Sequence, residues 1–147
     1  MIQRVFDFLY PCECPLCKNK TKVFLPFGMN PLVKPRENAQ CPKCKSLERH
    51  RLIWLFWERQ TNLFKEKLKM LHVAPEVQLS QLLQNMPNIE YVSVDLQSDT
   101  AMLKMDITDI KQPDNSYDVI YCSHVLEHIP DDRKAMFELR RVLRPEG

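Results

Sequence analysis

The sequence predicts an α/β fold in which a parallel sheet follows a small module held together by a metal. Over residues 69–147, short apolar runs alternate with helical or polar stretches, an alternation typical of parallel strands joined by crossovers. Residues 11–45 are instead rich in Cys, Pro, Lys and Asn and show no helical period. That composition favours a loop-built module that has no large apolar core.

Length and composition bound the kinds of protein that this chain can be. Its 147 residues have room for one ordinary domain and a small appended module, and its 44% apolar and 27% charged residues are typical of globular proteins. The longest apolar stretches, such as residues 52–57, are far shorter than the roughly 18 residues of a membrane helix. Asp7 interrupts the first apolar run and no small-residue cleavage site follows, so we expect a cytoplasmic protein without a secretory signal.

The net charge of +2 hides an asymmetry between the two parts of the chain. Residues 1–69 carry 14 Lys and Arg against 6 Asp and Glu, whereas residues 70–147 carry 7 against 13. Four zinc-bound thiolates would add about −2 to the first part, which would still favour an anionic partner, and RNA is the candidate. Attraction between two oppositely charged halves explains the asymmetry equally well.

Five of the six cysteines lie in the first 44 residues, and four of them form two C-x-x-C pairs, Cys14/Cys17 and Cys41/Cys44. Two such pairs joined by a loop are the ligand pattern of a zinc ribbon, in which each pair grips a tetrahedral Zn²⁺. Disulfides are the alternative, but they need an oxidising compartment. We expect Cys12 to be a spectator, and we expect no catalysis at this zinc because four thiolates leave no open position.

A helix is predicted from about residue 47 into the 60s, with Ser46 as its N-cap. Its apolar stripe consists of Leu47, Leu52, Ile53, Leu55, Phe56 and Phe64. The chain therefore divides into a zinc-ribbon module at 1–46, a linking helix at 47–68 and a sheet domain at 69–147. Within the first of these, Lys18 and Lys45 stand where a glycine often follows the cysteine turn, so we expect backbone strain there.

Four strands are predicted in the sheet domain, with the first strand central and the fourth beside it. They are Met70–Val73, Tyr91–Val94, Met102–Met105 and Val119–Cys122. One helix is expected over residues 77–86 and another over 135–143, behind Asp131 or Asp132 as cap. About eight residues connect the second and third strands, too few for a full crossover helix, so that helix is expected to be reduced or lost.

Four segments carry a likeness to a known family. They are KMLHVAPE, YVSVDL, KMDIT and the block DNSYDVIYCSHVLEHIPDDRKAMFELRRVLRPEG. With them, residues 69–147 resemble the opening of class I S-adenosylmethionine-dependent methyltransferases of the small-molecule type. The resemblance implies a partial Rossmann-like parallel sheet, S-adenosylmethionine as cofactor, and truncation after the fourth strand, where the family continues through three more. A non-enzymatic zinc-binding interaction protein on a decayed half domain is the alternative.

The resemblance also implies where the cofactor lies. Ligands of open parallel sheets bind at the carboxyl ends of the strands. The cofactor-binding candidates at that edge are Ala74, Glu76, Asp95, Asp106, Ile107 and Ser123. Asp95 is placed for the ribose hydroxyls, although a turn or helix-cap aspartate is an alternative, and Asp106 matches the family's adenine-contacting acid. Two departures predict modest affinity: Ala74-Pro75-Glu76 replaces the glycine-rich turn, and His72 replaces the usual acid of the first strand.

His124 is the candidate catalytic base. Methyl transfer is an in-line displacement in which a base is needed only if the nucleophile is protonated, and a histidine with its ordinary pKa near 6.5 accepts a proton at neutral pH. A structural histidine in a turn is an equal alternative. The stretch from His124 to His128 also matches the zinc-peptidase pattern H-x-x-E-H. Such a peptidase needs a further acidic ligand far downstream, and only 19 residues follow His128, so we expect the match to be a coincidence. Glu127 and His128 stay weak metal candidates, and Cys122 is expected in the core.

Overall fold

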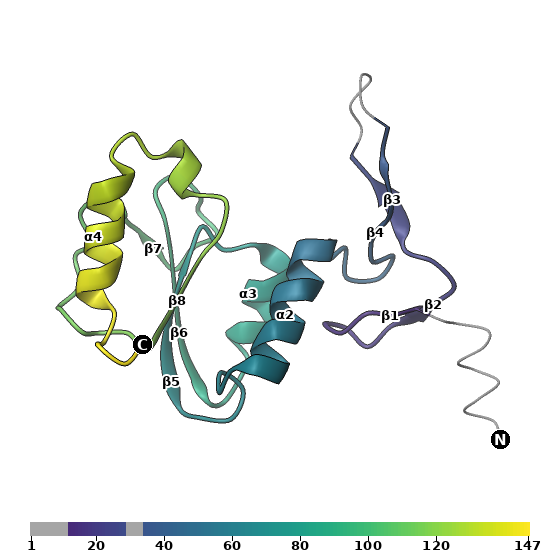
Figure 1. Cartoon of the computed structure of the whole chain (residues 1–147), viewed down its shortest axis with the longest axis horizontal. Helices are drawn as coiled ribbons and strands as arrows, with labels where there is room; N and C mark the ends of the chain where they lie inside the picture. Colours follow the sequence, from purple (N-terminus) through teal and green to yellow (C-terminus); the bar gives the residue numbers. More distant parts are fainter. Residues whose placement is uncertain (1–11, 29–33) are drawn as a thin grey trace. The chain divides into compact units, whose positions relative to one another are not determined.

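The computed structural model describes residues 12–28 and 34–147, which form two compact units that divide between Thr61 and Asn62. The first unit holds two short antiparallel ribbons and a helix, and the second holds a four-stranded parallel sheet with its helices (Figure 1). Residues 1–11 and 29–33, which fall within the predicted zinc-ribbon module, lie outside the described residues. Among the helices of the described ranges, none has the length and apolar character that crossing a membrane requires.

The ribbons of the first unit are too short to be stable through strand pairing alone. Strand β1 (Cys12–Glu13) pairs with β2 (Lys20–Thr21), and β3 (Leu25–Phe27) pairs with β4 (Arg36–Gln40). Isolated two-stranded ribbons are marginal in water. The buried side chains around them include Cys14, Ala39 and Cys41, all fully buried. Cysteines therefore occupy the interior of this unit, as its composition predicts.

Helix α2 (Glu48–Gln60) lies within the segment predicted to be helical, but two details of that prediction are wrong. Its N-cap is Leu47, whose backbone N–H donates to His50 Nδ1 at 3.1 Å, whereas the Ser46 hydroxyl contacts the cysteine sulfurs instead. Its buried face carries His50, Trp54 and Trp57, spaced four and three residues apart. Leu52 and Phe56 of the predicted stripe are 71% and 50% exposed, because they lie on the other faces of the helix.

The second unit confirms the predicted parallel sheet and its strand order. Strands β5 (Leu68–Val73), β6 (Ile89–Asp95), β7 (Leu103–Lys104) and β8 (Val119–Cys122) are all parallel, in the order β7-β6-β5-β8 (Figure 1). The first strand of the domain is therefore central, with the fourth beside it. Helix α3 (Val77–Leu83) joins β5 to β6, and β6 reaches β7 without a helix, as the short connection predicts.

The connection after β8 contains the short 3₁₀ turn η1 (Leu126–His128) and helix α4 (Asp132–Val142). The N-cap of α4 is Asp131, whose Oδ1 accepts the backbone N–H of Lys134 at 2.9 Å, which decides between the two predicted caps. Ala135 and Val142 face inward seven residues apart and join the core cluster of the sheet. That cluster consists of Leu71, Val73, Val94, Ile107, Ile110, Tyr117, Ala135 and Val142.

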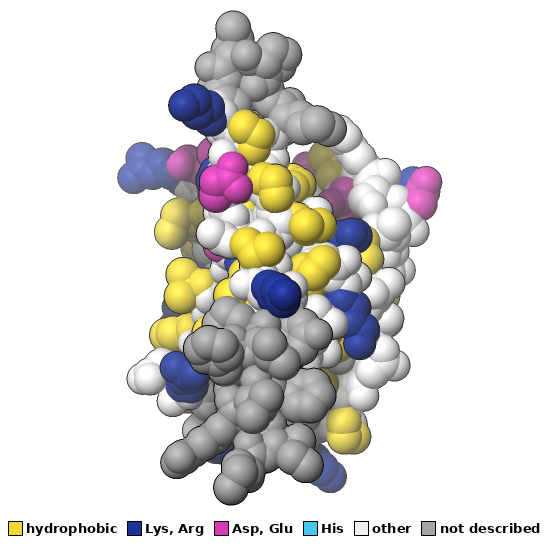
Figure 2. Space-filling model, turned by 90° about the vertical axis from the view of Figure 1, so that its right-hand side faces the viewer, with side chains coloured by type: hydrophobic (Ala, Val, Ile, Leu, Met, Phe, Trp, Pro, Cys, Tyr) yellow, Lys and Arg dark blue, Asp and Glu magenta, His cyan; other side chains and the backbone are white. Residues whose placement is uncertain are grey.

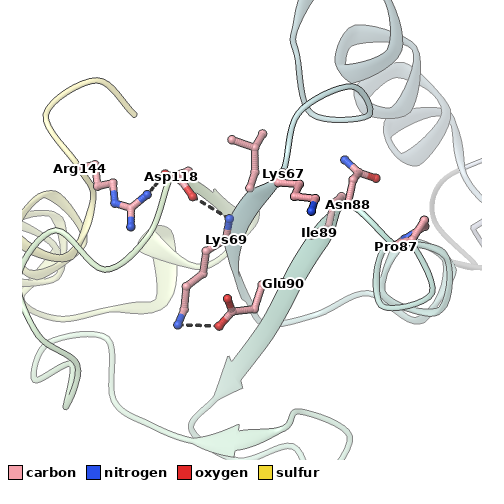
Figure 3. A pocket seen from close by; sticks show the side chains of 9 residues that line it. Lys67, Lys69, Pro87, Asn88, Ile89, Glu90, Asp118 and Arg144 are labelled. Carbon is pink, nitrogen blue, oxygen red and sulfur yellow. Dashed lines mark hydrogen bonds and ion pairs between the residues drawn. The ribbon is translucent and has the colours of Figure 1, made fainter.

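The amino ends of β5 and β8 are joined through Asp118. Its Oδ2 accepts the backbone N–H of Lys69 at 2.7 Å, and its Oδ1 accepts a hydrogen bond from Arg144 (Figure 3). A cavity of about 460 Å³ lies at this edge, where Lys69 Nζ also contacts Glu90 Oε1 at 2.7 Å. Because ligands of parallel sheets bind at the opposite, carboxyl edge, we assign these groups to holding the strands together.

We predict that Asp118→Ala lowers the free energy of unfolding of the second unit by about 1.5–3 kcal/mol, because two charge-assisted hydrogen bonds are lost at a half-buried position. Glu90→Ala is the matched control from the same cavity, since it removes an exposed ion pair that contributes less than about 1 kcal/mol. Urea unfolding followed by circular dichroism measures both. Equal effects of the two substitutions would contradict the role given to Asp118.

Candidate functional site

The register of the sheet brings the predicted cofactor segments to one edge. Val73 of β5 is paired with Val94 of β6 on one side and with Cys122 of β8 on the other. The residues that follow these three strands therefore emerge together at the carboxyl edge. A cavity of about 320 Å³ opens there, within the second unit.

The cavity includes most, but not all, of the predicted site residues. Five of them line it: Ala74, Asp95, Asp106, Ile107 and His124. The other lining residues are Val73, Leu96, Gln97, Met105, Val125, His128 and Ile129. Four of these seven directly adjoin a predicted residue in the sequence, namely Val73, Leu96, Met105 and Val125, so adjacency to Ala74, Asp95, Asp106 and His124 is the signal that finds them. Glu76 and Ser123 were predicted at the site but are not among the lining residues.

Asp95 ends β6 and holds the following turn. Its Oδ1 accepts the backbone N–H groups of Gln97 and Ser98, both at 2.7 Å. Oδ2 has no hydrogen-bond partner among residues 12–28 and 34–147. The turn role that was an alternative to ligand binding therefore uses one oxygen and leaves the second one available at the cavity.

Asp106 has a similar arrangement on the segment after β7. Its Oδ1 accepts both the backbone N–H and the hydroxyl of Thr108, each at 2.8 Å. These hydrogen bonds lower the pKa of the Asp106 carboxyl, so it is an anion at neutral pH. Ile107 beside it is buried, which gives this end of the cavity an apolar wall next to a carboxylate.

The turn after β5 keeps a glycine-like backbone without a glycine. Ala74 has φ +49°, in the left-handed region, and its N–H donates to Val94 O at 2.8 Å. That conformation costs a non-glycine residue about 1–2 kcal/mol. The hydrogen bond to β6 and the packing of Ala74 against the core hold the turn in place.

Glu76 lies toward His72 and not in the lining of the cavity. The His72 ring is fully buried, with Nδ1 2.9 Å from the Tyr91 hydroxyl and Nε2 4.0 Å from Glu76 Oε2. Glu76 therefore points toward β5, and only 17% of its side chain is exposed. Burial lowers the pKa of His72 to about 4, against the opposing effect of Glu76, so the imidazole is neutral at pH 7.

His124 follows β8 in a left-handed conformation, φ +56°, at the cavity. Its Nδ1 lies 3.3 Å from Glu127 Oε1. Only residues 126–128 are helical here, as a 3₁₀ turn, so His124 and His128 are not on successive turns of an α-helix, as a zinc peptidase requires. Cys122 packs against the core, and burial raises its pKa to about 11, in agreement with its predicted place.

The first unit brings the four predicted cysteines together. The Sγ atoms of Cys14, Cys17, Cys41 and Cys44 all lie within 4.8 Å of one another, and the separations Cys14–Cys44 and Cys17–Cys41 are both 3.7 Å. A tetrahedron with Zn–S bonds of about 2.3 Å has S···S edges of about 3.8 Å, so the donor set fits a zinc ion. The cysteines form no disulfides, and this is the one candidate metal cluster in the part of the chain that the structure describes.

The two cysteine pairs have the same local backbone. Lys18 N donates to Cys14 O at 2.8 Å and Lys45 N donates to Cys41 O at 3.0 Å. Both lysines have positive φ, +54° and +60°, at the positions where strain is predicted. Cys12 lies outside the cluster, with its Sγ 3.8 Å from the backbone oxygen of Lys22.

We predict that Ala74→Gly leaves the free energy of unfolding within about 0.5 kcal/mol of the wild-type value or raises it, because relief of left-handed strain offsets the lost methyl group and the added chain entropy. Ala135→Gly is the matched control, since Ala135 is buried in helix α4 and the change costs about 1 kcal/mol or more. Urea unfolding compares the two. A loss at Ala74 as large as that at Ala135 would show that the turn is not strained.

Comparisons with known proteins agree with this architecture. Residues 76–147 match the family described as "Methyltransferase domain". A protein of Aspergillus luteorubrus named "Probable methyltransferase ltbC" is 45% identical over 38 residues, which cover 24% of this chain and 13% of that protein. No solved structure matches the chain. The family match and the parallel strand order agree with the class I S-adenosylmethionine-dependent methyltransferase fold that the sequence predicts for the C-terminal unit.

Proposed function

We propose that the chain acts as an S-adenosylmethionine-dependent methyltransferase whose zinc-binding N-terminal module recruits the methyl acceptor. One observation carries the proposal. The segments after β5, β6 and β7, each predicted to contact the cofactor, line one cavity at the carboxyl edge of the sheet. This is the edge where nucleotide-like ligands bind in open parallel sheets.

The cavity offers a distinct set of groups to each part of the cofactor. The available Oδ2 of Asp95 would accept hydrogen bonds from the ribose hydroxyls, and the edge at Asp106 and Ile107 would hold the adenine between a carboxylate and an apolar wall. The turns at Ala74 and Ser123 would face the methionine end. Glu76 precedes helix α3 and remains in the proposal through its backbone, because its carboxylate points toward His72.

His124 is the residue that we propose for proton transfer. When bound, S-adenosylmethionine supplies a methyl group on a sulfonium, and the protein mainly orients the acceptor for in-line attack. Glu127 would accept the Nδ1 proton of His124, which leaves Nε2 to take a proton from a hydroxyl or amine acceptor. Such a base is needed only for an acceptor that is protonated at neutral pH.

The first unit would contribute a structural zinc and a recruiting surface. Cys14, Cys17, Cys41 and Cys44 would hold the ion, and four thiolates leave no position for catalytic water. The excess of Lys and Arg in this unit favours an anionic acceptor, and RNA is the candidate that we propose. Thiolate ligands of this kind persist in the reducing cytoplasm, which is the proposed location.

One observation favours a second candidate function, that of a non-enzymatic zinc-binding interaction protein. Pro75 has no backbone N–H, and Ala74 and Glu76 replace residues that in the resembled family let the cofactor approach closely. If this turn no longer admits the cofactor, the methyltransferase domain serves only as a scaffold. Measurement of cofactor binding distinguishes the two functions.

We predict that isothermal titration calorimetry detects S-adenosylmethionine binding and that Asp95→Asn weakens it about tenfold or more. The amide still accepts the two turn hydrogen bonds but loses the charge that strengthens bonds to the ribose. Asp109→Asn, at an exposed carboxylate that pairs with Lys111, is the control and should bind like the wild type. Unchanged affinity in Asp95→Asn would refute this placement, and no binding by the wild type would support the scaffold function.

We predict one zinc per chain by metal analysis of protein purified under reducing conditions. Cys41→Ser should lose the metal and unfold the first unit, because that unit has little other core, whereas Cys12→Ser should retain one zinc. Zinc should also be released as the pH falls, since protons compete with the metal for thiolates. A disulfide between Cys14 and Cys17 in freshly reduced protein would contradict the zinc assignment.

A further inference from the structure

We propose that the β3–β4 ribbon, residues 22–27 and 34–40, is a binding surface for single-stranded RNA. The proposal rests on the proposed function, in which the first unit recruits an anionic acceptor, and it names the surface and the form of the nucleic acid. Figure 2 looks onto this part of the molecule and shows hydrophobic side chains gathered among Lys and Arg side chains, with few Asp and Glu.

The first unit carries an excess of positive charge. Residues 12–28 and 34–61 carry ten Lys and Arg against four Asp and Glu. A zinc ion with four thiolates contributes about −2, so these residues keep a net charge of about +4. Three of the four carboxylates are already paired with a cation: Glu13 with Lys20, Glu48 with Arg36 and Glu58 with Lys18. The ammonium groups of Lys22 and Lys34, at the starts of the two ribbon segments, have no ion pair within the described ranges, so they remain available to phosphates.

The ribbon also presents aromatic side chains beside arginine cations. The Arg51 guanidinium lies 4.1 Å from the Phe24 ring centroid, and that of Arg36 lies 5.7 Å from the Phe27 ring centroid. Arg51 also donates to the backbone oxygens of Ala39 and Ser46 at 2.9 and 2.8 Å, which fixes its position. Arg36 is held by two hydrogen bonds to the Glu48 carboxylate, at 3.1 and 3.3 Å, and Phe27 beside it is 39% exposed. An aromatic ring beside a held cation is a stacking platform for an unpaired base.

Other occupants fit the ribbon less well than a single strand of RNA. Val23 and Leu25 add exposed apolar area to the ribbon, at 51% and 40%, which a protein partner would also cover. However, an apolar docking patch does not require an excess of one charge, whereas nucleic acid requires both the charge and the stacking faces. Duplex RNA keeps its bases paired and offers no free face to Phe27. The combination therefore favours a single strand.

The test is fluorescence anisotropy of the full, zinc-loaded chain with a labelled oligouridine of about 15 nucleotides, a length that spans an ordinary single-strand site. We expect the single strand to bind and a duplex of the same length to bind more weakly. Phe27→Ala should weaken binding roughly 5- to 160-fold, the range for loss of one base–aromatic stack. Phe27→Leu should weaken it nearly as much, because leucine keeps the apolar area but has no aromatic face.

Two controls make the result specific. Phe137→Ala changes a phenylalanine of the second unit that is 68% exposed, and it should bind RNA like the wild type. Lys22→Ala with Lys34→Ala should reduce the slope of log affinity against log salt by about 1.4, since each phosphate contact to a single strand contributes about 0.7. One zinc per chain in every variant shows that the first unit is folded.

Each remaining outcome overturns the proposal in a recognisable way. No binding of the single strand at low salt, equal binding of the duplex, or equal effects of Phe27→Ala and Phe137→Ala would each refute the RNA surface. Phe27-dependent self-association without RNA binding, measured by sedimentation velocity, would assign the ribbon to a second copy of the chain. S-adenosylmethionine binding is measured on the same samples. If the chain binds S-adenosylmethionine but not RNA, the RNA surface is refuted and the proposed methyltransferase function stands.

Discussion

Pairing of β5 along both of its edges is the constraint on which the second unit depends. Six residues of β5 pair with β6, and four of them also pair with β8, so the strand ends in register with both neighbours. Met70 to Val73 are buried as a result. The residues after Val73, Val94 and Cys122 must then emerge side by side, and the cavity at the carboxyl edge follows from this geometry. At the other end, Asp118 holds the start of β8 against Lys69 of β5.

The fold of the first unit depends on its four clustered cysteines. Its strands are two to five residues long and would not hold the chain, but the two cysteine pairs close loops of equivalent shape around one point. Ser46 belongs to this centre rather than to the helix, since its hydroxyl lies 3.4 Å from Cys14 Sγ and 3.2 Å from Cys44 Sγ. A surface on this unit, such as the β3–β4 ribbon, is therefore only as well formed as the cysteine cluster.

The sequence predicts the sheet well because strand formation and order depend on local pattern. Apolar runs define the four strands, and the short link after β6 correctly excludes a crossover helix. It predicts the buried face of α2 less well, because Leu52 and Phe56 are as apolar as the tryptophans that are buried instead. The placement of Glu76 failed for a different reason. Its carboxylate lies toward the buried His72 of the preceding strand, a placement that no spacing rule reveals.

The turn after β5, which has no glycine, bears on whether the domain is active or decayed. In the resembled family an acid lies within the strand and glycines follow it, whereas this chain has His72 in the strand and Glu76 after it. The Glu76 carboxylate, four residues further along the chain, lies 4.0 Å from the His72 imidazole. Ala74 meanwhile keeps the left-handed backbone that glycine would adopt freely, at a cost in strain. The hydrogen bond from the Ala74 N–H to Val94 and the packing of Ala74 against the core enforce this strained conformation. The turn therefore keeps a glycine-like backbone beside the cavity without a glycine, while the Glu76 carboxylate faces His72, and measurement of cofactor binding decides between an active and a decayed domain.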